Sequence, residues 1–402
     1  MLECGDVMDG MIDIINYIPA PKTVALEPEK INALLGTEIS KEDMVKYLNL
    51  LEIPVEGNDI LVPSWRPDLN LMADIAEEVG RSYGYNEIPT TAFKTSTQGG
   101  YTPMMKFEMK GGTVCRSIGY SEIITYSFVS PAIFDQIRLP KESPLRNVIR
   151  IQNPLGEDTS IMRTTALASM LDILSRNNAY HNKNAKLYEL AKIYLPKEGE
   201  LLPEEPKILV LGAYGDNTTF FSLKGDLEAI FKNLRLPKAS YSAVTDNPSY
   251  HPGRCAKVTM GDVELGYIGQ IHPLAAKNYG MDCEVYCAEI NFTKLAELQL
   301  PDATYVPLPK YPAVTRDLAV VCDEAVTVAQ VETVITAVSG KLLQNVKLFD
   351  IYRGTGIAEG KKSMAFSLEL RADDRTLTDS DSEQVMEKVL TALKEKLDAV
   401  IR

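Results

Sequence analysis

Residues 310–402 of this 402-residue chain alternate between two hydrophobic periods, and their order constrains the fold more than any other feature. Apolar and polar residues alternate, as in strands, over Leu318–Cys322, Val346–Tyr352 and Met364–Leu370. Apolar residues recur at helical spacing over Thr327–Val338 and again after Ser380–Glu383, which has the form of a capping box. The order strand, helix, strand, strand, helix leaves room for one short final strand. It predicts the split βαβ, or ferredoxin-like, topology.

Residues 24–92 have the pattern of a small domain built from helices and short strands. Helices are predicted at Pro28–Leu35 and after Ser40, whose hydroxyl can cap the second one. A strand at Asp59–Val62 precedes a third helix, which runs to about Tyr83. Two or three helices with short strands in this length predict a small winged-helix-type domain.

Residues 93–300 alternate strand-like and helix-like runs, a pattern typical of an α+β domain with a sizeable antiparallel sheet. The strand-like runs are Glu122–Val129, Ile208–Ala213, Ala256–Met260, Glu264–Gln270 and Glu284–Ile290, and the helix-like runs are Thr165–Asn177 and Lys224–Leu234. We therefore predict a multidomain α+β chain. Its parts are a remnant of a preceding region (1–23), a small acidic domain (24–92), an α+β core (93–300) and a C-terminal domain (301–402).

Composition and the first residues exclude several classes of protein. With 45% hydrophobic and 24% charged residues the chain is neither disordered nor collagen-like. No apolar run approaches the roughly 18 residues of a membrane helix, and the first residues carry acids where a secretory signal carries bases. Six scattered cysteines among apolar residues predict reduced thiols in a cytoplasmic protein.

The acidic residues are concentrated at one end of the chain. The formal net charge is −13, and residues 1–90 alone hold 17 acidic and 6 basic side chains. Because contact with phosphates depends on Lys and Arg, only this end is electrostatically unfavourable for RNA. A basic face elsewhere in the chain is compatible with the composition.

Four acids gather on and just before the helix that ends near Tyr83: Asp68, Asp74, Glu77 and Glu78. The spacing of the last three places them together, opposite the apolar side of the helix. Carboxylates this close repel one another, so one interpretation is a shared magnesium ion or the basic surface of a partner. The other is a solvated face, with Arg81 pairing Glu77 and Glu78 and with Asp68 as the N-cap. Spacing alone favours the solvated face.

Basic and aromatic residues interleave in the C-terminal domain. The basic ones are Lys310, Arg316, Lys347, Arg353, Lys361, Lys362, Arg371 and Arg375, and the aromatic ones are Tyr311, Phe349, Tyr352 and Phe366. On the open face of a sheet such residues can stack and neutralise single-stranded RNA. The alternative is a surface of salt bridges, and the sequence does not decide between the two.

Motifs for catalysis are missing from the sequence. The three histidines His181, His251 and His272 lie far apart, and no phosphate-binding loop, dinucleotide fingerprint or nucleophile elbow follows a strand-like run. Cys283 and Cys287 have no second Cys/His pair to complete a zinc site, so they indicate packing. His251 and His272 each precede a proline at a turn, where a histidine more often forms hydrogen bonds within its loop than carries a proton. We assign no catalytic residue.

Several ordered motifs in three consecutive modules resemble the beta subunit of bacterial phenylalanyl-tRNA synthetase, across essentially the whole chain. Those of the acidic domain are Pro63–Asp68, Asp74, Glu77–Glu78 and Gly84–Pro89. Those of the core are Asn153–Glu157, Met162–Leu167, Tyr188–Leu190, Leu223–Glu228 and the two His-Pro dipeptides. Lys310–Asp317 opens what looks like the ferredoxin-like anticodon-binding domain.

The resemblance implies an enzyme of two alpha and two beta chains that joins phenylalanine to its tRNA, using ATP and magnesium. Its active site lies in alpha, and the beta core has the class II synthetase architecture in degenerate form. This sequence agrees, because it lacks both the Phe-Arg-x-Glu motif and the glycine-rich segment ending in Glu-Arg. The magnesium ligands of the family map onto Asp68, Asp74, Glu77 and Glu78. This mapping reverses the preference for a solvated face that spacing alone gives.

For the anticodon domain the resemblance carries over only Arg316, as an RNA contact. The family's tRNA-binding domain and editing domain, which begin full beta chains, are not seen in this sequence. We therefore expect the C-terminal half of a longer chain, and we do not expect editing activity from it.

Three functional hypotheses follow. The leading one is a non-catalytic subunit fragment that scaffolds alpha, binds magnesium and contacts the anticodon region of the tRNA. The second is a stand-alone RNA-binding module without a synthetase partner. The third is a magnesium-dependent hydrolase that uses the acidic cluster.

Overall fold

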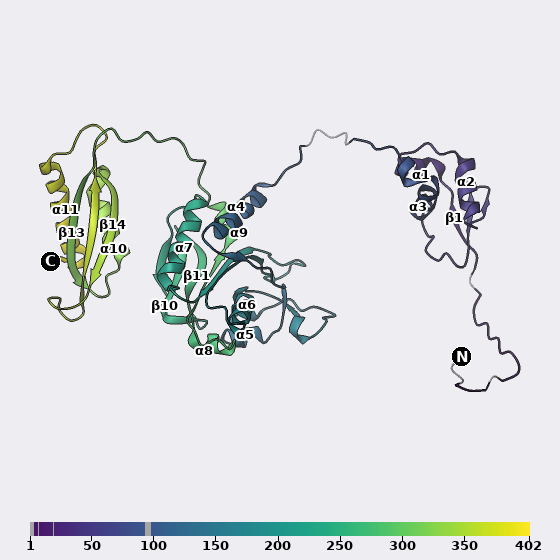
Figure 1. Cartoon of the computed structure of the whole chain (residues 1–402), viewed down its shortest axis with the longest axis horizontal. Coiled ribbons are helices and arrows are strands. Elements are labelled where there is room, and N and C mark those ends of the chain that lie inside the picture. Colours follow the sequence, from purple (N-terminus) through teal and green to yellow (C-terminus); the bar gives the residue numbers. More distant parts are fainter. Residues whose placement is uncertain (1–3, 7, 19, 93–97) are drawn as a thin grey trace. The chain divides into compact units, whose positions relative to one another are not determined.

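A computed structural model describes residues 4–6, 8–18, 20–92 and 98–402 of the chain. The chain divides into two compact units, the first ending at Thr102 and the second beginning at Pro103 (Figure 1). Among the described residues, no helix combines the length and the apolar character needed to cross a membrane.

The first unit is a three-stranded antiparallel sheet with three helices. Its strands pair in the order β1-β3-β2, and the sequence predicted β3 at its observed position. The elements are β1 (Lys22–Ala25), α1 (Pro28–Leu35), α2 (Lys41–Leu50), β2 (Val55–Glu56), β3 (Asp59–Val62) and α3 (Met72–Tyr83), followed by the 3-10 helix η1 (Tyr85–Glu87).

Local signals in the sequence fix the helices of this unit. Gly36 ends α1 with φ of +71°, a conformation that favours glycine. The Ser40 hydroxyl accepts a hydrogen bond from the backbone N–H of Asp43 and caps α2, as predicted. The helices bury Ile31, Met44 and Val79 against one another and the sheet, forming the small core of the unit.

The second unit begins with a seven-stranded sheet of order β4-β7-β8-β12-β11-β10-β9, in which only the β4–β7 pair is parallel. Its strands are β4 (Ser121–Glu122), β7 (Ala185–Lys192), β8 (Lys207–Tyr214), β9 (Ser240–Ala243), β10 (Tyr250–Met260), β11 (Val263–Ile271) and β12 (Val285–Asn291). A separate pair joins β5 (Phe128–Val129) and β6 (Ile161–Met162). The helices are α4 (Pro103–Ser117), α5 (Ile133–Gln136), α6 (Leu167–Ala179), α7 (Phe220–Asn233), α8 (Pro273–Asn278) and α9 (Phe292–Glu297), with the 3-10 helices η2 (Pro144–Arg146) and η3 (Glu157–Thr159).

Helices cover both faces of this sheet, and each face has its own apolar cluster (Figure 1). One cluster joins α4, α7 and α9 to the sheet through residues such as Leu227 and Phe292. The other joins α6 and α8 through residues such as Leu171 and Ala275. The inner strand β8 is buried on both sides, which explains its apolar sequence after Lys207.

Two expectations for the core were wrong or incomplete. The single strand expected over Glu122–Val129 is instead two short strands, β4 and β5, in different sheets. Helix α4 was not predicted, because Gly111 and Gly112 weaken its helical signal. The structure explains Gly111: a Cβ there would lie 2.8 Å from the Phe292 ring.

Residues 314–401 form a four-stranded antiparallel sheet of order β14-β15-β13-β16 with two helices. Its elements are β13 (Val314–Asp323), α10 (Val328–Ser339), the 3-10 helix η4 (Gly340–Leu342), β14 (Leu343–Tyr352), β15 (Lys361–Leu370), α11 (Asp379–Leu397) and β16 (Val400–Ile401). This order confirms the ferredoxin-like topology, including the short final strand, and with it the multidomain α+β fold class.

The predicted start of α11 was two residues too late. The capping box is made by Thr378 and Asp381, not by Ser380 and Glu383. The Thr378 hydroxyl accepts from the backbone N–H of Asp381 at 3.3 Å, and an Asp381 carboxylate oxygen accepts from the backbone N–H of Thr378 at 2.9 Å. Aspartate thus does here what glutamate does in the usual box.

Candidate functional site

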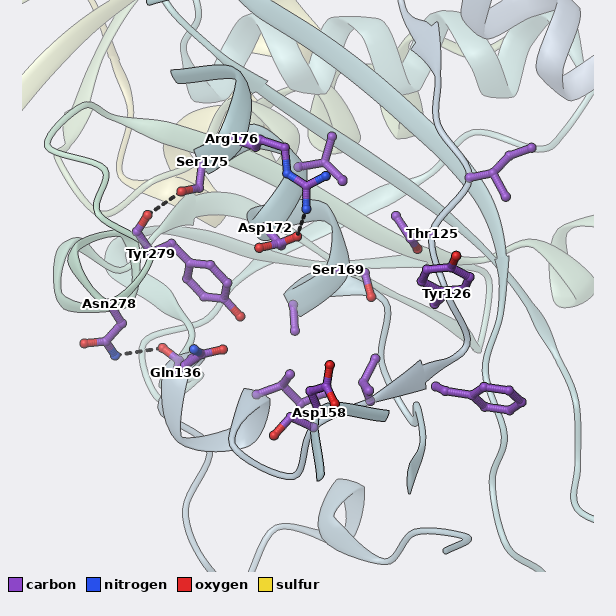
Figure 2. Close-up of a pocket in the computed structure, with 17 residues that line it drawn as sticks. Thr125, Tyr126, Gln136, Asp158, Ser169, Asp172, Ser175, Arg176, Asn278 and Tyr279 are labelled. Atoms are coloured by element: carbon purple, nitrogen blue, oxygen red, sulfur yellow. Dashed lines mark hydrogen bonds and ion pairs between the residues drawn. The ribbon is translucent and has the colours of Figure 1, made fainter. Parts of the chain in front are cut away.

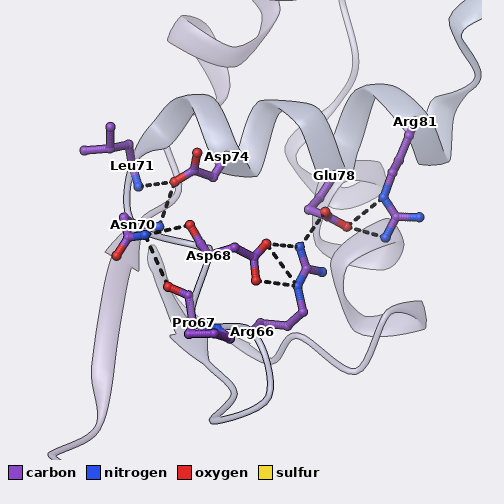
Figure 3. Close-up of polar contacts among 8 residues, drawn as sticks. All are labelled: Arg66, Pro67, Asp68, Asn70, Leu71, Asp74, Glu78 and Arg81. Atoms are coloured by element: carbon purple, nitrogen blue, oxygen red, sulfur yellow. Dashed lines mark hydrogen bonds and ion pairs between the residues drawn. The ribbon is translucent and has the colours of Figure 1, made fainter. Parts of the chain in front are cut away.

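Two of the four predicted metal ligands, Asp68 and Glu78, contact one arginine that the interpretation from spacing did not include. Arg66 stands in the turn between β3 and α3, and Figure 3 shows its guanidinium between the carboxylates of Asp68 and Glu78. Arg66 Nη2 lies 2.6 Å from Asp68 Oδ2 and 2.7 Å from Glu78 Oε1. One internal cation therefore bridges two of the four acids.

Glu78 is buried, with 6% of its side chain exposed. Arg66 holds Glu78 Oε1, and Arg81 Nε donates to Oε2 at 2.8 Å. Burial alone would raise the pKa of Glu78, but the hydrogen bonds from the two arginines outweigh burial, and the pKa is lowered. Glu78 is therefore an ionised carboxylate whose two oxygens are both engaged.

Asp68 and Asp74 have partners of different kinds. The main cause that lowers the pKa of Asp68 is its hydrogen bonding with Arg66, whose Nε lies 3.0 Å from Oδ1. Asp74 Oδ2 accepts from the backbone N–H groups of Asn70 and Leu71, each at 2.7 Å, and these bonds lower its pKa. Asp74 thus satisfies amides at the beginning of α3.

This geometry corrects the shared exposed face from which both interpretations of the acidic cluster were argued. The acids do not share one exposed face, because Glu78 is buried and Asp74 is partly buried, and of the three acids on α3 only Glu77 is exposed. Arg81 pairs with Glu78 alone among the described residues, and α3 begins after Leu71, so Asp68 is not its N-cap. The mutual repulsion of the carboxylates is relieved by arginines and amides.

As arranged, these residues do not fit a shared ion. In the described part of the chain, no group of three or more His, Cys, Asp or Glu side chains is placed to hold a metal. The oxygens of Asp68 and Glu78 face guanidinium groups, which occupy the positions that a cation would take. The magnesium set of Asp68, Asp74, Glu77 and Glu78 therefore stays a prediction.

Arg316 lies on β13 and contacts the beginning of α11. Its Nη2 donates to Asp379 Oδ1 at 2.8 Å and to Ser382 Oγ at 2.9 Å. Strand alternation places it on the same face as Leu318 and Val320, which the helices cover. Arg316 thus joins the strand to the helix, and its predicted RNA contact is not tested by this arrangement.

The basic and aromatic residues of the C-terminal domain do not all gather on the open face of its sheet. Phe366 is fully buried in the core, and Lys362 is buried with its Nζ donating to the Glu324 carbonyl. The open face does carry Tyr352, whose ring centroid lies 4.9 Å from the guanidinium carbon of Arg402. A cation on an aromatic face is one element of an RNA-binding surface.

The core holds a cavity of about 810 Å³ beside α6. Figure 2 shows Asp172 and Arg176 of α6 and Tyr279, which follows α8, around it. Asn278 Nδ2 donates to the Gln136 carbonyl at 2.8 Å, which joins two sides of the wall. Its lining among the described residues contains neither histidine nor cysteine.

The core contains a buried ion pair that was not predicted from the sequence. Arg163, which is 2% exposed, pairs with Glu189 of β7 at 3.1 Å and donates to Thr125 Oγ1 at 2.6 Å and to the Lys192 carbonyl at 2.8 Å. Its guanidinium is therefore engaged by protein oxygens. The signal available in the sequence was Glu189 inside the otherwise apolar run Leu187–Ala191.

The histidines behave as their turn positions predicted. His251 Nδ1 accepts from the backbone N–H of Gly253 at 3.0 Å, and His272 Nδ1 accepts from that of Leu274 at 3.1 Å. Each ring thus satisfies its own turn. Cys287 is buried in β12 and packs in the apolar cluster on the α6 side, in agreement with a packing role.

Comparison with known families defines the class of protein. Residues 24–85 match the tRNA synthetase B5 domain, and residues 309–402 match the ferredoxin-fold anticodon binding domain. These modules, one before and one after the α+β core in the sequence, are those of an aminoacyl-tRNA synthetase. Residues 88–292, half of the chain, match the phenylalanyl tRNA synthetase beta chain CLM domain. The chain therefore belongs to the phenylalanyl-tRNA synthetase beta chain family.

Curated relatives are similar over the whole chain. The phenylalanine–tRNA ligase beta subunit of Clostridium tetani is 44% identical over 407 residues, which cover 100% of this chain and 51% of that protein. The beta subunit of Clostridium acetobutylicum is 40% identical, with the same coverage of both chains. That of Moorella thermoacetica is 37% identical and covers 100% of this chain and 52% of its own length. The chain thus spans about half the length of the curated relatives it matches.

Proposed function

We propose that this chain acts as a non-catalytic beta-subunit component of phenylalanine–tRNA ligase in the bacterial cytoplasm. In this role it supports the ATP-dependent attachment of phenylalanine to its tRNA. The observation that carries the proposal is the order of three family modules along one chain. The full length of this chain is also 44% identical to about half of a named beta subunit. Two such chains would assemble with two alpha chains.

The active site of the proposed assembly lies in the alpha chain. Two observations support this part of the proposal. The sequence lacks the arginine-bearing motifs of a class II ATP site. The buried arginine of the core, Arg163, is held by Glu189 and is not free to stabilise a phosphate.

The C-terminal domain is proposed to contact the anticodon region of the tRNA. The match of residues 309–402 to an anticodon-binding family supports this role. Lys347, Tyr352 and Arg402 lie on the open face of the sheet, where bases can stack and phosphates can be neutralised. Arg316 is proposed as an additional contact on the resemblance alone.

Magnesium binding by Asp68, Asp74, Glu77 and Glu78 is proposed with a structural condition. The Arg66 guanidinium would have to leave Asp68 and Glu78 before an ion could take its position. Calorimetric titration of magnesium into the chain alone and into its complex with alpha tests this proposal. Heat of binding in the complex that is lost in Asp74→Asn would support it, and no uptake in either sample would contradict it.

Reconstitution tests the main proposal. The chain is mixed with purified alpha chain, the mixture is separated by size-exclusion chromatography, and charging of phenylalanine tRNA is measured. We expect a stable complex and more charging than alpha alone supports. Absence of both would contradict the proposal.

The two other hypotheses are less well supported. The match of the C-terminal domain alone would be enough for a stand-alone RNA-binding module, whereas the family matches also extend through the first unit and the core. RNA affinity that alpha leaves unchanged, together with no complex, would favour that module. No observation favours a hydrolase, since Asp74 Oδ2 already accepts two backbone hydrogen bonds.

A further inference from the structure

A second cavity in the core, of about 520 Å³, lies over the face of the seven-stranded sheet on the α6 side. Six aliphatic side chains form one part of its wall: Ile137, Leu139, Leu145, Leu167, Ile193 and Ile208. The rest of the lining is more polar and includes the charged Glu264 and Lys294. This size lies within the range of about 300–1,000 Å³ typical of small-molecule sites. Such sites combine apolar walls with a few placed polar groups, and two polar groups meet that description here.

The first polar group is Glu289 of β12. Its Oε1 accepts from Thr165 Oγ1 and from the backbone N–H of Ala166, both at 2.8 Å. No lysine or arginine among the described residues forms an ion pair with Glu289, because the nearby Arg163 is paired with Glu189. Burial raises the pKa of Glu289, although the hydrogen bonds from Thr165 and Ala166 and the charge of Arg163 act in the opposite direction. Glu289 Oε2 accepts from Thr165 Oγ1 at 3.0 Å. A carboxylate oxygen has more than one lone pair, so Oε2 can accept a further donor.

The second polar group is Tyr250 of β10, which is 3% exposed. Its hydroxyl has no hydrogen-bond partner in the described part of the protein. The ring lies against Gly269 of β11, where a Cβ would be only 3.0 Å from Tyr250 Cδ1. A buried hydroxyl without a partner is unusual in a folded protein and indicates a missing acceptor.

We propose that this cavity binds a small primary amine that carries an apolar body and a hydrogen-bond acceptor. The ammonium group pairs with Glu289, the acceptor takes the Tyr250 hydroxyl, and the body lies against the apolar wall. This proposal goes beyond the tRNA ligase function and does not depend on it, because all its residues lie within the core.

Leucinamide is a suitable probe, because it supplies the ammonium, a carbonyl acceptor and a branched apolar side chain. Its matched control is 4-methylpentanamide, which has the same skeleton without the amine. Titration into the full chain is followed by isothermal calorimetry and by saturation-transfer NMR. We expect saturable binding of leucinamide that is at least about tenfold tighter than binding of the control, since the lost contact is to a charged group.

Two variants test the two polar groups of the site. Glu289→Gln keeps an oxygen for Ala166 and Thr165 but removes the charge, and it should weaken leucinamide binding by at least about tenfold. Tyr250→Phe removes only the unpartnered hydroxyl, so it should weaken binding without lowering the melting temperature. Glu284→Gln, at an exposed acid that pairs with Arg254 outside the cavity lining, is the control and should leave binding unchanged.

Several results would overturn the proposal. They are no saturable leucinamide binding, equal binding of leucinamide and 4-methylpentanamide, and leucinamide binding that survives both Glu289→Gln and Tyr250→Phe. A crystal structure with only a water on Tyr250 after soaking in leucinamide would also overturn it.

Discussion

Glu78 is buried as an ion because two guanidinium groups reach it, one from the turn before α3 and one from the next turn of the helix. The side chain of Arg66 is 23% exposed, whereas that of Asp68 is 57% exposed. Loss of a partner from a buried pair leaves an uncompensated charge, while loss of an exposed partner is screened by water. The contact of Arg66 with Glu78 should therefore contribute more to the stability of the unit than its contact with Asp68.

We predict that Arg66→Met destabilises the first unit by about 2–4 kcal/mol, because Glu78 loses the donor to one of its buried oxygens. Asp68→Asn, the matched control, should change stability much less. Trp65 is the sole tryptophan of the chain and lies in this unit, so its fluorescence in a denaturant titration measures the change. Equal midpoints for Arg66→Met and the unmodified chain would contradict a structural role for Arg66.

The pH dependence of this unit follows from the same contacts. The folded-state pKa of Glu78 is lowered from its ordinary value of 4.5, so the carboxylate contributes stability above that value. The contribution is lost as the pH falls through the lowered folded-state pKa. We expect the Trp65 denaturant midpoint to drop below about pH 4.5, and Glu78→Gln to reduce this drop. A drop of the same size in Glu78→Gln would assign the acid sensitivity to other carboxylates.

At the scale of elements, caps and strand alternation decide where each helix begins and which face each strand buries. The Ser40 cap was predicted correctly because its hydroxyl and the apolar spacing after it agree. The cap of α11 was predicted two residues late, because Ser380 and Thr378 each precede a possible box. Only the hydrogen bonds between Thr378 and Asp381 distinguish the two positions.

A pair of variants separates those two positions. Thr378→Ala should destabilise the beginning of α11 by about 1 kcal/mol, the usual loss for a removed N-cap. Ser380→Ala should have little effect. Hydrogen exchange of peptides from the first turn of α11 measures the change. Faster exchange in Ser380→Ala than in Thr378→Ala would support the cap predicted from the sequence.

Arg316 provides a test of structural and RNA-binding roles together. We expect Arg316→Ala to lower the stability of the C-terminal domain by about 1 kcal/mol, because its bonds to Asp379 and Ser382 join β13 to α11. Thermal melting followed by circular dichroism measures this change, with Arg353→Ala as an exposed control. Weaker tRNA binding by Arg316→Ala at a temperature where the variant is folded would support the RNA contact that the resemblance predicts.

At the scale of the whole molecule, the family matches divide the chain into modules with separate proposed roles. The net charge is −13, and the acidic first unit is a poor surface for RNA. The C-terminal domain carries the match to an anticodon-binding family. Binding of tRNA and binding of alpha should therefore be separable along the chain.

We predict that a chain ending at Leu308 loses at least about tenfold in affinity for phenylalanine tRNA but still co-elutes with alpha. Filter binding at fixed salt and size-exclusion chromatography measure the two properties. The full chain in the same buffers is the control. Undiminished tRNA affinity after the deletion would contradict the role proposed for the C-terminal domain.

The sequence by itself determined the multidomain α+β class, the β-α-β-β-α order of the last domain and the positions of α1, α2 and β3. These follow from local hydrophobic periods and caps, which act between residues close in the chain. Only the tertiary structure decided which partners the acids of the cluster have, because charge spacing does not show which oxygens face a guanidinium. Arg66 meets Glu78 across 12 positions, and Tyr250 and Glu289 come from two different strands of one sheet. Such contacts depend on how the elements pack, which periodicity does not encode.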